Sequence, residues 1–187
     1  MLVELKYCFA LQFEEDWSFD GQLSKFNQTL RNDLPQIMDQ EDLLYHMSHS
    51  IFIVSFGNND FMANYLPPSN GTFSTLLPET FGKVLLDAFS IRLTALYKLG
   101  ARKMVVNNVW PLGCTPHYIK SSDALDSCNM TVNRYLLPYS TGIPGMLSGL
   151  ASSLAGSSFS NSDNFEFVRD LKKNPATYGN QSNNDQI

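Results

Sequence analysis

Apolar residues recur every three or four positions in several stretches of the chain, a spacing that places them on one face of an α-helix. The longest stretch runs from Glu79 to Leu99, and Gly100 follows it where a left-handed residue closes many helices. The same spacing predicts shorter helices over Gln22–Arg31, Gln40–Met47, Cys128–Leu137 and Phe165–Lys173. We expect Pro138 to interrupt the helix that begins at Cys128, because proline lacks the backbone donor that a helix needs.

Two short runs have the pattern of strands instead. Ile51–Val54 and Met104–Val106 are nearly continuous in apolar, mostly β-branched residues, which is typical of buried strands in a parallel sheet. Their alternation with helices predicts an α/β fold. Polar clusters follow both strands, at Gly57–Asp60 and Asn107–Cys114. Ligands of such folds bind at the carboxyl ends of the strands, so the sequence predicts a site there.

Composition narrows the class of protein. A chain of 187 residues with 43% apolar and 17% charged residues suits one domain with a sizeable core and does not resemble a disordered segment. The net charge of −5 and the absence of Lys/Arg runs make nucleic acid an unexpected partner. No apolar run approaches the ~18 residues of a membrane span, and the acidic start Met1–Lys6 does not have the pattern of a signal peptide.

One segment carries a recognisable motif. Residues Ser50–Phe61 read Ser-Ile-Phe-Ile-Val-Ser-Phe-Gly-Asn-Asn-Asp-Phe and resemble the third conserved block of plant GDSL esterase/lipases, which are SGNH hydrolases with a Gly-x-Asn-Asp core. Further matches stand in the family's order at Leu99–Val106, Pro111–Pro116, Cys128 with Asn133, and Asn174–Gly179. The resemblance covers about residues 22–179, within residues 1–187 taken as a single partial domain.

The resemblance implies a flavodoxin-like, three-layer α/β/α fold with a parallel sheet. It also implies hydrolysis of carboxylic esters by a Ser-His-Asp triad, with a small-molecule or lipid ester as substrate and no cofactor or metal. In the family, one donor to the reaction's oxyanion is the asparagine of the third block, which corresponds to Asn59, supported in its loop by Gly57 and Asp60. The family pattern further implies a disulfide between Cys114 and Cys128, and a secreted plant enzyme of lipid metabolism.

Several family features are absent from this sequence. No Gly-Asp-Ser occurs, the glycine-rich second block is not recognisable, and there is no Asp-x-x-His block. Ser and Asn replace the strand expected between Leu154 and Phe165. Loss of the nucleophile alone typically lowers the rate by about 10⁶. We therefore expect a family member that is truncated and catalytically incomplete, or alternatively a non-catalytic α/β binding protein derived from the esterase fold.

Other residues offer weaker candidates for chemistry. His46 and His49 have the spacing of two metal ligands on one helix face, but no third ligand stands at a useful spacing, so no metal site is expected. The remaining candidates for a triad are ordinary polar residues at Ser50, Ser55, Ser69 and His117. Cys8 is expected to be an unpaired, buried residue. Trp110 is expected to pack at the strand end rather than to contact substrate.

The strand at Ile51–Val54 is also expected to be an edge. In doubly wound sheets the first strand lies in the middle, and in the family that strand carries the serine motif that is missing here. Without it, Ile51–Val54 would present an unpaired edge with large apolar side chains. The sequence therefore predicts marginal stability and self-association through this strand.

Overall fold

The structure is a computed structural model that describes residues 18–66, 76–119 and 128–179. The α-helices and strands follow one another as α1 (Phe19–Gln28), α2 (Gln40–His49), β1 (Ile51–Ser55), α3 (Asn58–Asp60), α4 (Pro78–Lys98), β2 (Lys103–Asn107), α5 (Pro116–Ile119), α6 (Met130–Ser153), β3 (Ser158–Ser162) and α7 (Asn164–Lys173). Short π- or 3₁₀-helical turns extend or link them at η3 (Thr29–Asp33), η4 (Leu34–Gln36), η5 (Phe61–Tyr65), η6 (Leu112–Cys114) and η7 (Pro175–Tyr178). None of the helices among these described residues is long and apolar enough to span a bilayer.

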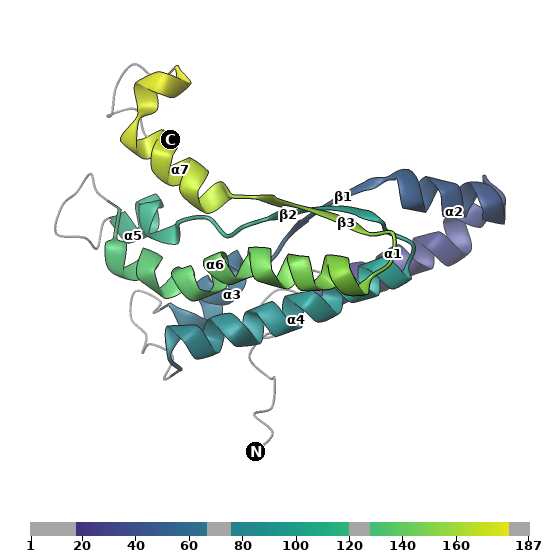
Figure 1. Cartoon of the computed structure of the whole chain (residues 1–187), viewed down its shortest axis with the longest axis horizontal. Coiled ribbons are helices and arrows are strands. Elements are labelled where there is room, and N and C mark those ends of the chain that lie inside the picture. Colours follow the sequence, from purple (N-terminus) through teal and green to yellow (C-terminus); the bar gives the residue numbers. More distant parts are fainter. Residues whose placement is uncertain (1–17, 67–75, 120–127, 180–187) are drawn as a thin grey trace.

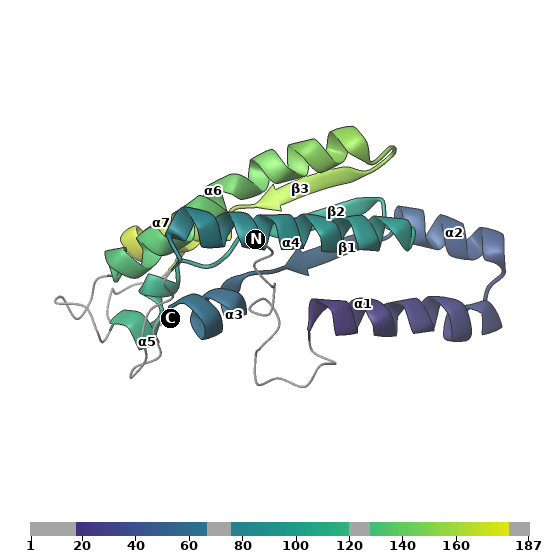
Figure 2. The same cartoon turned by 90° about the horizontal axis from the view of Figure 1, so that it is seen from below.

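The three strands form a parallel sheet in the order β1-β2-β3. Helices α4 and α6 are the crossovers between successive strands, and both lie on the same face of the sheet (Figures 1 and 2). Because the strands are added in one direction, crossovers of one hand must fall on one face. The parallel α/β arrangement is therefore the one that the sequence predicts. The described residues form part of an α/β/α fold.

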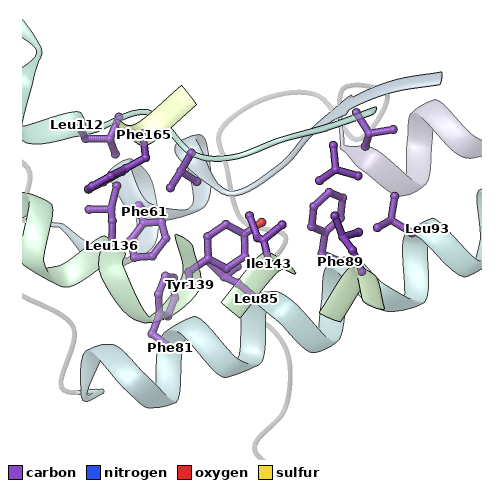
Figure 3. Packing of buried hydrophobic residues seen from close by; sticks show 14 of the residues in the cluster. Phe61, Phe81, Leu85, Phe89, Leu93, Leu112, Leu136, Tyr139, Ile143 and Phe165 are labelled. Atoms are coloured by element: carbon purple, nitrogen blue, oxygen red, sulfur yellow. The ribbon is translucent and has the colours of Figure 1, made fainter. Parts of the chain in front are cut away.

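The core fills the space between this sheet face and the two crossover helices (Figure 3). Val54, Met104 and Val106 point from the strands into this space. The helices contribute larger side chains, among them Phe81, Leu85, Phe89, Leu136, Tyr139 and Ile143. Helix α1 packs beside α4, where Phe19 meets Phe89 edge to face at 6.3 Å between ring centroids.

The sequence predicts that β1 is buried on both faces, but the face opposite the helices is exposed. Ile51 and Ile53 point away from the helices, and their exposed fractions are 66% and 71%. Only alternate residues of β1 face the core, because side chains of a strand point to opposite faces. Among the described strands only β2 pairs with β1, so the predicted edge position of this strand is observed.

The prediction that the strand before Phe165 is lost is wrong, since Ser158–Ser162 forms β3. Only one apolar residue of this strand, Phe159, packs against the core, which is too little for an apolar pattern. Backbone bonds fix the strand: Ser158 N–H donates to Arg102 O at 2.7 Å, and Asn108 N–H donates to Ser162 O at 2.9 Å.

The prediction that Pro138 interrupts a helix is also wrong, because α6 runs through both Pro138 and Pro144. A proline leaves the carbonyl four residues earlier without its helical donor. For Pro144 that carbonyl belongs to Ser140, and the Asn108 side-chain amide donates to it at 3.3 Å. The Asn108 side chain, from the loop after β2, thus supplies a donor in place of the missing proline N–H.

Candidate functional site

The turn after β1 requires glycine at its first position. Gly57 has a φ of +112°, which side-chain-bearing residues rarely adopt. A Cβ at this residue would also lie 2.9 Å from the Tyr139 ring and 3.0 Å from Val109. The chain then enters α3 directly, and Phe61 N–H donates to Gly57 O at 2.9 Å. The backbone path that places the following Asn-Asn-Asp therefore depends on Gly57.

These three polar residues have different environments. Asn58 accepts a hydrogen bond from Trp110 N–H at 2.9 Å, which joins the turn to the loop after β2. Asp60 is buried, whereas Asn59 between them is exposed to solvent. The carboxyl end of β1 thus presents Asn59 outward from a turn whose neighbouring residues are held in place.

Helix α6 is bonded to both the turn after β1 and the loop after β2. The Tyr139 hydroxyl donates to Phe56 O at 2.8 Å, immediately before Gly57. The buried Asn108 side chain donates to Ser140 Oγ at 2.9 Å and accepts from Val109 N–H at 2.8 Å. No pattern in the sequence pointed to Tyr139 or Ser140 as part of the site. The polar Asn108 directly after an apolar strand was the available signal for this network.

Asp60 is the buried ionisable group nearest to Asn59 in the chain. Burial raises the pKa of Asp60 from 3.8 to about 6, while its own backbone N–H and the Arg92 guanidinium act in the opposite direction. Arg92 is itself buried and pairs with Asp20 at 2.8 Å between Nη2 and Oδ2. A negative charge on the buried Asp60 carboxylate is therefore costly in the folded chain.

The loop after β2 is held by a second set of contacts. A disulfide joins Cys114 to Cys128, the pair that the family resemblance implies. Asn133 accepts from Gly113 N–H at 2.8 Å, and a Cβ at Gly113 would clash with Asn129 O. These contacts fix the loop against the start of α6. Cys8 lies outside the described residues.

The other candidates for chemistry do not gather around Asn59. His46 and His49 lie on α2, which precedes β1, so five strand residues, roughly 16 Å, separate them from the turn. Ser55 Oγ accepts from Asn107 at 3.0 Å, Ser50 Oγ donates to His46 O at 2.7 Å, and exposed His117 lies on α5. Ser69 lies outside the described residues.

One serine does lie near an imidazole. Ser48 Oγ is 3.1 Å from His49 Nδ1, but that nitrogen is also 2.9 Å from Tyr45 O. A carbonyl can only accept, so Nδ1 carries the proton and cannot act as a base toward Ser48. No group of three or more His, Cys, Asp or Glu side chains that could hold a metal ion occurs among the described residues.

Comparisons with known proteins place the chain in a family. Residues 12–186 match the family model described as GDSL-like Lipase/Acylhydrolase. The chain belongs to this family. The "GDSL esterase/lipase At4g16230" of Arabidopsis thaliana is 33% identical over 173 residues, which are 91% of this chain and 47% of that protein. The "GDSL esterase/lipase At2g23540" of the same plant is 35% identical over 168 residues, 87% of this chain and 43% of that protein.

A third relative, "GDSL esterase/lipase 7" of Arabidopsis thaliana, is 30% identical over 166 residues, which cover 87% of this chain and 46% of that protein. The chain thus spans less than half the length of these curated GDSL relatives.

Proposed function

We propose that this chain supplies the oxyanion-binding side of an ester-hydrolysing site, with the Asn59 side-chain amide as the donor. The observation that carries the proposal is the exposed Asn59 in a turn at the carboxyl end of β1, held by Gly57 and by the Asn58–Trp110 hydrogen bond. Membership of the GDSL family supports the same role. An oxyanion donor is effective because it is fixed before charge develops, and this turn is fixed from two sides.

The proposal separates the oxyanion donor from the nucleophile. The sequence contains no Gly-Asp-Ser, and within the described residues no serine is paired with an imidazole that could take its proton near Asn59. A single donor such as Asn59 typically contributes about 2.7–4 kcal/mol in the transition state, which cannot replace a nucleophile and its base. We therefore assign to this chain the binding of an ester carbonyl, with a small-molecule or lipid ester as the ligand class.

The experiment begins with the coding region on both sides of this reading frame. If a Gly-Asp-Ser segment and an Asp-x-x-His segment are continuous with it, the joined protein is assayed on a short-chain chromogenic ester. Asn59→Ala should lower kcat by about 10²–10³ with a smaller change in KM, because the donor acts mainly in the transition state. Asn32→Ala, on the exposed η3 turn, serves as the matched control. An unchanged kcat in Asn59→Ala contradicts the proposal.

We further propose that the protein is secreted, in keeping with the plant lipid enzymes that the chain resembles. The support is the Cys114–Cys128 disulfide, since such bonds persist in oxidising compartments and are rare in the cytosol. Peptide mapping of the protein from its native tissue under non-reducing conditions tests this proposal. Recovery of both cysteines as free thiols would contradict it.

We also propose that the chain self-associates through β1. The support is the edge position of this strand together with the exposure of Ile51 and Ile53, because an unpaired apolar edge is a template for another strand. Ile53→Lys should shift the chain toward monomer in sedimentation equilibrium. Ile91→Lys alters an isoleucine of similar exposure on α4 and should leave the association unchanged. Equal association of both variants rules out β1 as the contact.

A further inference from the structure

Trp110 is a large apolar side chain that the fold leaves in water at the site. The residues on either side of it, Val109 and Pro111, are buried, whereas the exposed fraction of Trp110 is 50%. Indole is among the largest apolar surfaces that a protein can bury, so this exposure has a free-energy cost. The sequence predicts that Trp110 packs at the strand end, and this prediction is wrong for the half of the side chain that is exposed.

The backbone at Trp110 is nevertheless firmly held. Its own N–H donates to Asn58 Oδ1 at 2.9 Å, and the preceding N–H, of Val109, donates to Asn108 Oδ1 at 2.8 Å. The buried Leu112 and the disulfide at Cys114 fix the chain that follows. Exposure of this indole therefore comes from a well-anchored loop.

The Trp110 backbone is bonded to the turn that carries the proposed oxyanion donor. The bond is to Asn58, which directly precedes Asn59 in the turn. Met62 lies three positions after Asn59, on the π-helical segment η5 that continues the turn. Met62 is exposed as well. An amide donor with exposed apolar side chains nearby matches an ester, whose polar carbonyl adjoins a hydrocarbon chain.

We propose that Trp110 contacts the hydrocarbon chain of the ester whose carbonyl oxygen Asn59 binds, and thereby sets the preference for chain length. This inference rests on the function proposed above. Asn58 is a positioning residue in this scheme, since its side chain holds the Trp110 backbone next to Asn59. No covalent step is involved, and the inference concerns only which part of the ester each residue binds.

The test uses the 187-residue chain in a Trp17→Phe background, which leaves Trp110 as the only indole of the two in the sequence. Ethyl butyrate, ethyl hexanoate and ethyl octanoate are titrated while the Trp110 indole N–H resonance is followed by NMR. The resonance should shift saturably, and affinity should rise by about two- to fourfold for each added methylene that is buried. Hexyl acetate, compared with ethyl hexanoate, shows whether the acyl or the alcohol chain lies on the indole.

Variants separate the contact of Trp110 with the hydrocarbon chain from the hydrogen bond of Asn59 to the carbonyl. Trp110→Ala, followed through the Asn59 side-chain amide, should lose the dependence on chain length, and Trp110→Phe should keep part of it. Asn58→Ala should weaken that dependence, whereas Asn58→Asp keeps an acceptor oxygen and should restore it. Tyr45→Ala removes an exposed aromatic side chain from α2 and should change nothing. Thermal melts check that each variant is folded.

Two results overturn the inference: an indole resonance that does not respond to any ester, or a chain-length dependence that survives Trp110→Ala. Ethyl hexyl ether, which has the chain of ethyl hexanoate but no carbonyl, isolates the proposed function. If the ether and the ester bind equally while Trp110→Ala still abolishes the chain-length dependence, the role of Asn59 fails and the Trp110 contact stands.

Discussion

Removal of the Tyr139 hydroxyl should destabilise the chain more than the same change at an exposed tyrosine. Tyr139 is fully buried, and its hydroxyl donates to Phe56 O at 2.8 Å. Tyr139→Phe keeps the ring in contact with Gly57 and leaves that partly buried carbonyl without this donor. An unsatisfied buried group costs about 1–3 kcal/mol, so the free energy of unfolding should fall by that amount.

Tyr97→Phe is the matched control. The Tyr97 hydroxyl donates to Ala155 O at 2.9 Å, but this bond is exposed, so water can replace it at a cost below about 0.5 kcal/mol. Urea unfolding of both variants, with unchanged denaturant slopes, measures the difference. Tyr139→Phe should also speed amide exchange at Gly57–Asp60, because the bond anchors the residue before the turn. Equal loss of stability in the two variants would refute the idea that α6 holds the turn through Tyr139.

Three further outcomes follow from the site. The purified chain should hydrolyse a short-chain chromogenic ester no faster than a heat-treated control; saturable turnover that Asn59→Ala abolishes would show that a nucleophile was overlooked. Replacing Cys114 and Cys128 by serine should lower the free energy of unfolding by about 3 kcal/mol in urea titrations, for a separation of 14 residues; an unchanged midpoint contradicts this. Because the pKa of Asp60 is raised from 3.8 to about 6 in the folded chain, the folded state holds this proton more tightly than the unfolded state. Stability should therefore fall by up to about 3 kcal/mol as pH rises from about 4 to about 6, and a pH series on Asp60→Asn should lack this decline.

Apolar periodicity was sufficient to predict most of the elements that build the core, although not the full length of α6. Helices α2 and α4 and strands β1 and β2 lie within a few residues of their predicted positions, because each has an apolar face that the fold buries. Strand β3 contributes only Phe159 to the core, and its Ser-Phe-Ser-Asn-Ser sequence pairs through backbone groups that every residue carries. Side-chain patterns therefore could not reveal it.

Part of the candidate site could likewise be predicted from the sequence, and part could not. The position of the turn could be predicted, since Gly57 and the polar residues after it are adjacent in the sequence. The contacts that hold it could not, because Tyr139 bonds to a carbonyl 83 positions earlier and Asn108 to a serine 32 positions later. Such pairs follow from how α6 packs against the sheet, which local patterns do not encode. The exposure of Trp110 likewise depends on neighbours that only the folded chain brings together.

The role of Asn59 is tested most directly by its side-chain amide resonances in the purified 187-residue chain. Ethyl hexanoate and ethyl hexyl ether are titrated in parallel, since they differ only in the carbonyl group. We predict a saturable downfield shift of the Asn59 amide protons with the ester and none of comparable size with the ether, because only the carbonyl oxygen accepts a hydrogen bond in the proposed position. Identical shifts with the two ligands, or no shift with either, would contradict the assignment of Asn59 as the oxyanion donor.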